Sequence, residues 1–147
     1  MNRKFWFVIL PVLALLLVGA VSLVRGPENL VGDGLSQIPT PQGGYTSIKS
    51  DELAQMLKSK NFYFVNVHIP YAGEIEGTDA KIPYNEIKKN IGKFPPDKGA
   101  RIVVYCMSGS MSRTAAQILV SLGYTNVLDL TGGMIAWERD GYKLLSK

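Results

Sequence analysis

The apolar and polar positions of the chain follow two different periodicities. Short runs of consecutive apolar residues are typical of strands buried on both faces of a parallel sheet, whereas apolar residues three and four apart form one face of a helix. The runs predict strands at Tyr45–Ile48, Phe62–Val67, Ile102–Tyr105 and Val127–Leu130. The helical spacings predict helices after Ser50, over Ser112–Leu122, from Gly132-Gly133 to Arg139, and a short one over Tyr84–Ile91. Strands that alternate with helices indicate an α/β fold in which helices flank an open central parallel sheet.

Residues at the ends of the predicted helices indicate where each helix begins and ends. Ser50 is a suitable N-cap for the first helix, with Asp51 and Glu52 in a first turn where carboxylates are favourable. Gly123 is expected to end the second long helix, because glycine readily adopts the left-handed conformation that stops a helix. The stretch His68–Pro83 shows neither period and is predicted to be irregular.

A continuous apolar segment, Phe5–Val24, stands apart from the rest of the chain. It has 20 residues without a charge, and a helix of that length spans about 30 Å, the thickness of a bilayer hydrocarbon core. We therefore expect a single-pass anchor in the cell membrane. Arg3 and Lys4 favour a cytoplasmic N-terminus, which places the rest of the chain outside the cytoplasm. The alternative for residues 1–24 is a signal peptide cleaved near Gly19–Ser22, which would release a secreted domain.

The rest of the chain divides into a linker and one domain. Glycines and prolines without apolar periodicity predict a flexible linker at 25–44, and the about 103 residues of 45–147 suit a single folded domain. The net charge is only +4, and the positive residues of the domain are scattered rather than clustered. We therefore expect no nucleic-acid partner, and we expect the domain to be a monomer.

The single cysteine of the chain, Cys106, directly follows the predicted strand Ile102–Tyr105. Ligands in open α/β sheets bind beyond the carboxyl ends of strands, and a short loop leading into a helix can surround an anion with backbone N–H groups. Gly109 allows such a loop to turn tightly. A thiolate held there is a nucleophile that can form a covalent intermediate. From the spacing alone, a reactive thiol and an inert buried cysteine are equally open interpretations.

Three motifs follow one another in the second half of the chain. They are a strand leading into Cys-x-x-Gly at 102–109, the helix end Leu122-Gly123-Tyr124-Thr125-Asn126-Val127, and the segment Leu130-Thr131-Gly132-Gly133-Met134-Ile135-Ala136-Trp137. Together they resemble the single-domain rhodanese family of sulfurtransferases, whose last motif is Leu-x-Gly-Gly-x-x-Ala-Trp. The resemblance covers nearly all of 45–147 and implies a rhodanese-like fold. It also implies sulfurtransferase activity: sulfane sulfur moves from a donor (thiosulfate, a persulfide or a polysulfide) to a nucleophilic acceptor through a Cys106 persulfide.

The resemblance assigns roles to the residues around the cysteine. Cys106 is the catalytic nucleophile, and its two half-reactions predict ping-pong kinetics. The residues expected to cradle the persulfide or the donor are Met107, Ser108, Gly109, Ser110, Met111, Ser112 and Arg113. No metal or organic cofactor is implied, and one Cys with one His is too few ligands for a zinc site. The expected partners are a small sulfur-containing donor and a thiol or other nucleophilic acceptor.

The predicted loop departs from the family pattern in its charge. Many thiosulfate-using members have arginines one and five residues after the cysteine, where this chain has Met107 and Met111. A lost hydrogen bond to a charged group costs roughly 1.5–3 kcal/mol. We therefore hypothesise that thiosulfate is a poor donor and that a polarizable or neutral persulfide is preferred. In the alternative arrangement, the two methionines pack against the domain and Arg113 bends back to supply the charge.

A second departure lies upstream of the cysteine. Where related proteins often carry Asp-Val-Arg at the end of the preceding strand, this chain has Asn66-Val67-His68. His68 is either an acid/base group near Cys106 or a structural residue at a strand end. The loop 72–79 carries three carboxylates, which form either a solvated charged loop or a rim that repels anions or weakly binds a cation. Asn66 and His68 are therefore candidates for support of the site.

Two further functions stay open. A non-enzymatic rhodanese-like module would only carry sulfur or bind a partner, and the altered Asn66–His68 segment favours it. A phosphatase or arsenate reductase would use Cys106 with an arginine six residues later. Ser112 occupies that position in this chain, and Arg113 lies seven residues after Cys106 instead of six.

Overall fold

The computed structural model describes residues 36–40 and 43–145. Within these ranges, no helix is both long enough and apolar enough to cross a bilayer. The predicted anchor or signal segment at 1–24 lies outside the described residues, as does most of the predicted linker at 25–44.

The described residues form a six-stranded sheet in the order β1-β2-β6-β5-β3-β4. The strands are β1 Ser36–Thr40, β2 Gly43–Ile48, β3 Tyr63–Asn66, β4 Ala80–Lys81, β5 Ile102–Tyr105 and β6 Val127–Leu130. Neighbouring strands are parallel except at one edge, where β1 runs antiparallel to β2. The two central strands, β5 and β6, are buried along their whole length because helices cover both faces.

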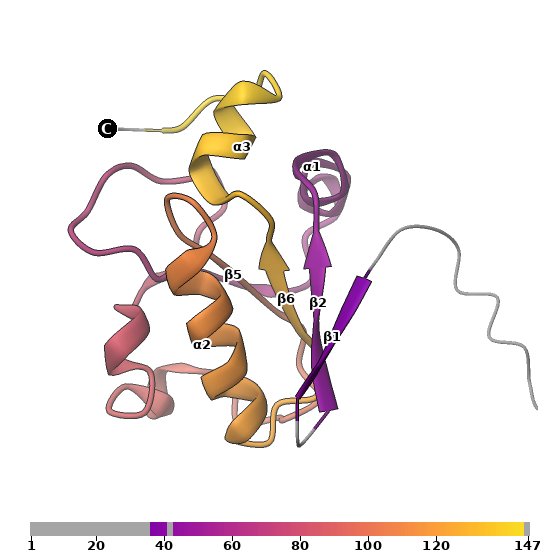
Figure 1. The fold of residues 1–147 in the computed structure, drawn as a ribbon, viewed down its shortest axis with the longest axis vertical. Coiled ribbons are helices and arrows are strands. Elements are labelled where there is room, and N and C mark those ends of the chain that lie inside the picture. Colours follow the sequence, from indigo (N-terminus) through magenta and orange to yellow (C-terminus); the bar gives the residue numbers. More distant parts are fainter. Residues whose placement is uncertain (1–35, 41–42, 146–147) are drawn as a thin grey trace, which may run out of the picture. The chain divides into compact units, whose positions relative to one another are not determined.

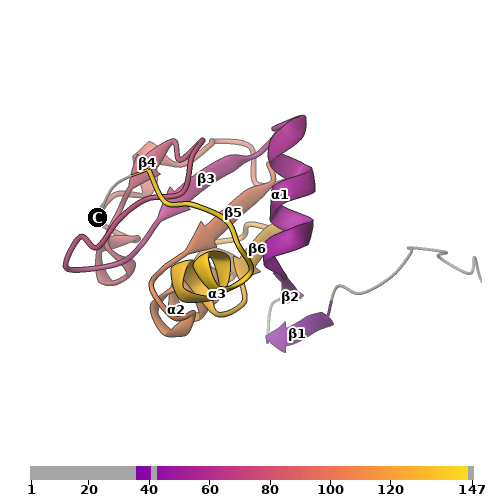
Figure 2. The ribbon, with the colours of Figure 1, turned by 90° about the horizontal axis from the view of Figure 1, so that it is seen from above.

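Helices of the described chain pack against both faces of this sheet. They are α1 Ser50–Lys58, α2 Ser110–Ser121 and α3 Gly133–Arg139, with 3₁₀ turns η1 Tyr84–Glu86 and η2 Ile91–Lys93. Figure 1 shows α2 in front of the sheet and α3 beyond the arrowhead of β6. Seen from above in Figure 2, α1 and α2 lie on opposite sides of the strands.

Side chains that alternate along β5 divide the hydrophobic core between the two faces. Ile102, Val104 and Cys106 point to the face covered by α2 and the 3₁₀ turns. Val103 and Tyr105 point to the face covered by α1 and α3. Cys106 therefore continues the row of β5 side chains beneath α2, just past the carboxyl end of the strand.

The predicted parallel α/β core is confirmed, and its strands fall where the apolar runs indicate. Two of them, β5 and β6, have the predicted limits. The sequence analysis did not predict the two edge strands, β1 and β4. Strand β4 lies in the stretch 68–83, which we expected to be irregular. Strand β1 and the first residues of β2 fall inside the segment 25–44, so these residues are strand and not linker. Prolines suggested a linker there, but an edge strand tolerates proline because one row of its amides is unpaired.

Two helix predictions need correction. The expected helix over Tyr84–Ile91 is replaced by the turns η1 and η2. Asn90 donates its side-chain amide to the Glu86 carbonyl at 3.0 Å, and such local bonds compete with regular helix. Ser50 is the first residue of α1 and not its N-cap. The cap position belongs to Lys49, whose backbone N–H donates to Glu52 Oε2 at 2.7 Å.

Candidate active site

Cys106 is held between the end of β5 and the start of α2. Its side chain is buried, with 1% of the residue exposed. The Sγ atom accepts the backbone N–H of Gly109 at 3.1 Å, and the thiol donates to Ser112 Oγ at 3.5 Å. A backbone amide and a hydroxyl therefore face the sulfur, and both can donate to it when it is a thiolate.

The turn that brings these groups to the sulfur depends on Gly109. This residue is the N-cap of α2 and has a φ of 92°, in the left-handed region that favours glycine. Helix α2 begins at Ser110, two residues before the predicted start at Ser112. Ser112 and Arg113 therefore belong to the first turn of the helix, close to its positive end.

The predicted cradle residues divide into those that face the sulfur and those that do not. Gly109 and Ser112 contact Sγ, and Ser112 is fully buried. The Ser108 and Ser110 side chains are exposed, so of the three serines in the predicted cradle only Ser112 contacts the sulfur.

The uncharged side chains of the loop are partly buried. Met107 packs against the core beneath α1 and α3, and Met111 packs against the core beneath α2. Arg113 returns towards the loop: a β-carbon placed on Gly109 would lie 3.6 Å from Arg113 Nη1. Both methionines thus pack against the core, and the exposed Arg113 side chain lies beside the loop.

The Gly-Gly motif at the start of α3 holds the backbone that carries the cysteine. The N–H groups of Met134 and Ile135 donate to the carbonyls of Cys106 and Met107 at 2.9 and 3.0 Å. A β-carbon on Gly133 would overlap the Cys106 carbonyl, so only glycine allows α3 to approach this closely. The sequence marks these glycines as a family motif, but this physical role appears only once the elements are placed.

Asp129 is a buried acid that the sequence analysis did not single out. It lies on the central strand β6, has 1% of its surface exposed, and pairs in register with Val104 of β5. Burial raises its pKa from 3.8 to about 6, against the opposing effects of a hydrogen bond from Ser112 and the positive charge of Arg113. The available signal was a lone acidic residue within the apolar run 127–130.

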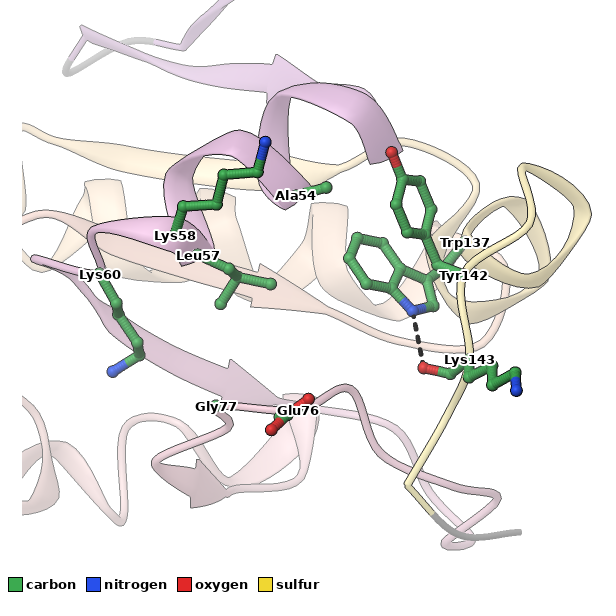
Figure 3. Close-up of a pocket in the computed structure, with 9 residues that line it drawn as sticks. All are labelled: Ala54, Leu57, Lys58, Lys60, Glu76, Gly77, Trp137, Tyr142 and Lys143. Atoms are coloured by element: carbon green, nitrogen blue, oxygen red, sulfur yellow. Dashed lines mark hydrogen bonds between the residues drawn. The ribbon is translucent and has the colours of Figure 1, made fainter.

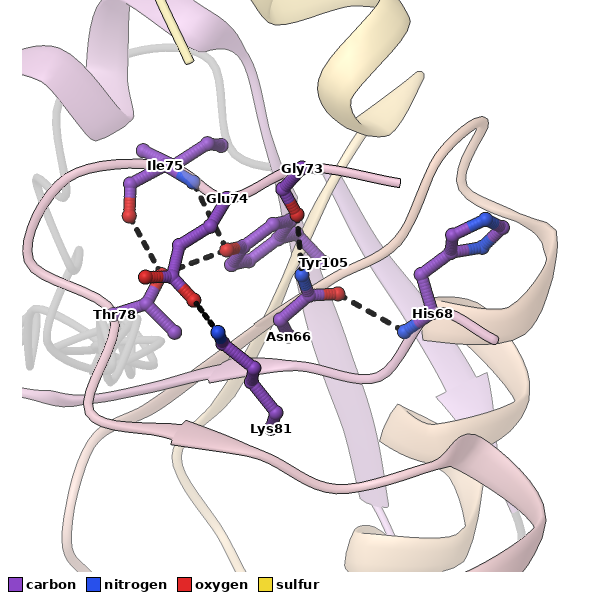
Figure 4. A network of polar contacts seen from close by, with 8 residues as sticks. All are labelled: Asn66, His68, Gly73, Glu74, Ile75, Thr78, Lys81 and Tyr105. Carbon is purple, nitrogen blue, oxygen red and sulfur yellow. Dashed lines mark hydrogen bonds and ion pairs between the residues drawn. The ribbon is translucent and has the colours of Figure 1, made fainter. Parts of the chain in front are cut away.

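Asn66 holds the neighbouring loop and the backbone of His68, as Figure 4 shows. The Asn66 side-chain amide donates to the Gly73 carbonyl at 2.9 Å and accepts the backbone N–H of His68 at 3.0 Å. Val67 between them donates its N–H to the Tyr105 carbonyl, which places His68 at the same end of the sheet as Cys106. The imidazole Nδ1 of His68 is buried and has no hydrogen-bond partner among the described residues.

The Tyr105 side chain connects β5, the strand that leads into the cysteine, to residues 72–79, which we call the acidic loop. Its hydroxyl accepts the N–H of Ile75 at 3.1 Å and lies 2.7 Å from Thr78 Oγ1. Burial raises the pKa of Tyr105 to about 12, so the hydroxyl stays neutral. Figure 4 shows these bonds together with the ion pair that Glu74 makes with Lys81.

The carboxylates of the loop 72–79 are largely neutralised. Glu74 pairs with Lys81 at 2.8 Å, and Asp79 pairs with Lys60 at 2.6 Å, whereas Glu76 is exposed. No group of three or more potential metal ligands occurs among the described residues. The loop is therefore better described as an ion-paired surface segment than as a cation site.

A pocket of about 660 Å³ opens on the other face of the sheet, between α1, the acidic loop and the C-terminal segment. Figure 3 shows Trp137, with Tyr142 stacked beside it, at one side of this pocket and the side chains of α1 at the other. The residues lining the pocket are Ala54, Leu57, Lys58, Lys60, Glu76, Gly77, Trp137, Tyr142 and Lys143. None of them belongs to the loop 106–113, so the pocket is separate from the cysteine.

The fold and the arrangement around Cys106 agree with a comparison against known families. Residues 49–140 match the Rhodanese-like domain family, and the chain belongs to that family. The chain is 34% identical over 103 residues to a sulfurtransferase of Allochromatium vinosum, covering 67% of this chain and 94% of that protein. It is 35% identical over 72 residues to the thiosulfate sulfurtransferase PspE of Escherichia coli, covering 48% and 69% respectively.

Solved structures and more distant relatives place the same fold in other proteins. A rhodanese-related protein from Thermoplasma volcanium superposes with a TM-score of 0.59 and 26% identity, covering 69% of this chain and 98% of that one. A tRNA uridine(34) hydroxylase of Hamiltonella defensa is 26% identical over 125 residues, but the chain spans only 35% of its length. The fold thus occurs both alone and as part of larger proteins.

Proposed function

We propose that this protein is a rhodanese-like sulfurtransferase that carries sulfur as a persulfide on Cys106. The observation that carries the proposal is the position of Sγ in the turn between β5 and α2, where it accepts the Gly109 amide and contacts the Ser112 hydroxyl. A thiolate in such a turn is stabilised by the amide and the hydroxyl. The names of the similar sulfurtransferases support the same reaction class.

The first half-reaction forms one S–S bond and breaks another. The Cys106 thiolate attacks the sulfane sulfur of the donor, and the electron pair of the donor's S–S bond leaves with the remaining group. With thiosulfate the products are the Cys106 persulfide anion and sulfite, and with a persulfide donor they are the Cys106 persulfide anion and a thiolate. The Gly109 amide, the Ser112 hydroxyl and the Arg113 guanidinium are the groups that we expect to stabilise the negative charge.

The second half-reaction regenerates the cysteine. A nucleophilic acceptor attacks the outer sulfur of the persulfide, and the Cys106 thiolate leaves with the electron pair. Because donor and acceptor use the same loop in turn, we expect ping-pong kinetics. No redox cofactor or metal is needed, since sulfur moves with its electrons balanced in each step.

Intact-mass measurement of the purified full-length protein tests the proposal. After exposure to thiosulfate, to a low-molecular-weight persulfide or to polysulfide, we expect an adduct of about 32 Da, one sulfur atom, as covalent catalysis requires. The chain has one cysteine, so Cys106→Ser must abolish the adduct. Addition of a small thiol should remove the sulfur and restore the original mass.

The alternatives give different results in the same experiment. A non-enzymatic sulfur carrier would form the adduct but would not return it catalytically to a small thiol. A phosphatase or arsenate reductase would form no adduct and would hydrolyse an aryl phosphate or reduce arsenate in a Cys106-dependent manner. The absence of an adduct with every donor would contradict the proposed function.

A further inference from the structure

The pocket between α1, the acidic loop and the C-terminal segment has no part in the reaction described above (Figure 3). Its volume of about 660 Å³ lies within the usual range of small-molecule sites, roughly 300–1,000 Å³. Such sites combine an apolar lining with a few polar groups that fix the orientation of the ligand. The residues of this pocket divide in the same way.

A stacked pair of aromatic rings forms one wall of the pocket. The ring centroids of Trp137 and Tyr142 lie 4.3 Å apart, with 26° between the ring planes. Trp137 Nε1 donates to the Lys143 carbonyl at 3.1 Å, and the Tyr142 hydroxyl donates to Asp51 Oδ1 at 2.8 Å. Because both polar atoms are used within the protein, the pair offers a ligand only apolar ring surface. That surface suits another aromatic ring, since aromatic pairs gain energy beyond the area they bury.

The wall formed by α1 is apolar as well. Ala54 and Leu57 lie three residues apart on α1, so they share one face of the helix, and both are half-buried. Gly77 of the acidic loop lies beside them: a β-carbon there would be 3.2 Å from Leu57 Cδ2 and 3.6 Å from Lys60 Cδ. The backbone of Gly77 therefore leaves room next to Leu57 that a side chain would fill.

Lysine side chains stand at the mouth of the pocket. Figure 3 shows Lys58 and Lys60 at the α1 side and Lys143 at the side of the C-terminal segment. Lys60 is neutralised by Asp79 at 2.6 Å. Lys58 bonds to a neutral partner, the Gln55 side chain, at 2.8 Å, and within the described ranges no carboxylate pairs with Lys58 or Lys143. The mouth thus carries two uncompensated positive charges.

Glu76 is the carboxylate among the lining residues, and it is exposed. Its single negative charge is outweighed by Lys58 and Lys143, so the local field favours an anion. The long lysine stems allow the ammonium groups to follow an anion at the mouth, while exposure to water keeps each contact weak. The apolar walls therefore supply most of the affinity, and the lysines select the charge.

We propose that this pocket is a second binding site of the protein, which takes a small aromatic molecule that bears one carboxylate or a similar anionic group. The aromatic ring lies against Trp137 and Tyr142, and the anionic group lies at the mouth near Lys58 and Lys143. The inference does not rest on Cys106, since no residue of 106–113 lines the pocket.

Labelling of the full-length protein with 5-fluorotryptophan tests the proposal, because the chain has only two tryptophans. The variant Trp6→Phe assigns the two ¹⁹F signals. Titration with naphthalene-2-carboxylate should shift the Trp137 signal saturably and leave the Trp6 signal in place. A Trp137 signal that does not move, or equal shifts of both signals, would overturn the proposal.

Two related probes separate the contributions of ring and charge. Naphthalene-2-carboxamide keeps the ring without the charge and should bind about two- to fivefold more weakly than the carboxylate, the loss expected for exposed ion pairs. Acetate keeps the charge without the ring and should not shift the Trp137 signal at the same concentration. Equal affinities for the carboxylate and the carboxamide, or an equal response to acetate, would overturn the assignment of an aromatic anion.

Charge variants test the lysines. Lys58→Gln combined with Lys143→Gln should lower the affinity for the carboxylate to that for the carboxamide. Lys88→Gln combined with Lys89→Gln removes the same charge from the exposed segment between η1 and η2 and should leave both affinities unchanged. Glu76→Gln should raise the affinity for the carboxylate by about twofold, because it removes the opposing charge. Wild-type affinities in both pocket variants would overturn the proposal.

A cysteine variant separates this site from the proposed reaction. Cys106→Ser should bind naphthalene-2-carboxylate as the wild type does, and loss of binding in this variant would overturn a separate site. If the wild type forms no persulfide but binds the probe with the expected charge preference, the proposed function fails and the second site stands.

Discussion

The Cα of Gly133 lies against the carbonyl group of Cys106, so closely that a β-carbon on Gly133 would overlap the carbonyl oxygen. The next residue, Met134, donates its N–H to that same oxygen at 2.9 Å. The residue that carries the sulfur is thus fixed by a helix that begins 27 positions later in the chain. The geometry of the loop therefore depends on α3 as well as on the strand before it.

Gly133→Ala should displace the Cys106 loop. The added methyl group must move backbone atoms, since Met107 C would lie only 2.8 Å from it, and we expect a loss of about 3 kcal/mol or more from overpacking and left-handed strain together. The rate of Cys106 alkylation at a fixed pH should change with it. Chemical unfolding and alkylation kinetics measure the two effects.

Gly141→Ala is the matched control for that experiment. Gly141 has a φ of 94°, so alanine is strained there too, but nothing lies within 4 Å of an added β-carbon. We expect a loss of only about 1 kcal/mol and no change at the cysteine. Equal effects of the two substitutions would mean that close approach to Cys106 is not what requires Gly133.

Donor preference should depend on the charge beside Gly109. Arg113→Gln should lower kcat/KM for thiosulfate by about 10- to 100-fold, the loss expected for one hydrogen bond to a charged group, and should affect a low-molecular-weight persulfide less. Met111→Arg should raise kcat/KM for thiosulfate, because it adds a cation at the position where related enzymes carry one. Steady-state kinetics with both donors measure the ratio.

Arg101→Gln provides the control for charge alone. Arg101 is exposed and lies just before the start of β5, where its guanidinium bonds to Asn61 at 3.3 Å. Its loss should leave the donor ratio unchanged. If wild-type kcat/KM is already similar for thiosulfate and the persulfide, the hypothesis that the protein disfavours thiosulfate is wrong.

The stability of the protein should fall as pH rises through the titration of Asp129. The folded protein raises the pKa of this acid from 3.8 to about 6, so it binds the proton more tightly than the unfolded chain does. Its contribution to stability is therefore most favourable below about pH 4 and is lost by about pH 6, a difference of about 3 kcal/mol. Asp129→Asn should be more stable than the wild type at pH 8, by up to this amount, and the difference should vanish at low pH.

Urea unfolding at a series of pH values measures this effect. Asp97→Asn, which removes an exposed carboxylate, should follow the pH dependence of the wild type. A wild-type protein that is more stable than Asp129→Asn at pH 8 would show that the carboxylate contributes to stability rather than reducing it.

Asn66→Asp should weaken the fold, although aspartate is the residue that related proteins often have there. A carboxylate cannot donate to the Gly73 carbonyl, which Asn66 reaches at 2.9 Å, and the position is buried. We expect a loss of about 1–3 kcal/mol at neutral pH. Asn85→Asp, on the surface, should leave the free energy of unfolding unchanged. Urea unfolding of the two variants measures the difference.

Local pattern was sufficient to predict the core of the fold and the position of the cysteine. Apolar runs locate β5 and β6, and the rule that ligands bind beyond the carboxyl ends of strands places Cys106 where the structure has it. Edge strands β1 and β4 were missed because they are short or interrupted by proline, and neither has an apolar period.

The partners of Cys106 could not be predicted in the same way. Ser112 reaches the sulfur because α2 begins at Ser110, and Asp129 lies beside Val104 because of the register between β6 and β5. Both depend on contacts between segments far apart in the chain. A single acidic residue in an apolar strand is a signal of a buried polar site, but it does not indicate which residue lies opposite.

The first turns of α2 and α3 both contact the Cys106 loop, but they bond to different parts of it. At α2, the Gly109 amide and the Ser112 hydroxyl face the sulfur, whereas the first amides of α3 are committed to the backbone carbonyls of Cys106 and Met107. The shape of the loop is thus maintained by main-chain bonds that no side chain of residues 107–111 supplies. Substitutions in this segment at positions other than Gly109 can change which sulfur compound is accepted while the scaffold stays intact, so this loop is well suited to the evolution of new donors.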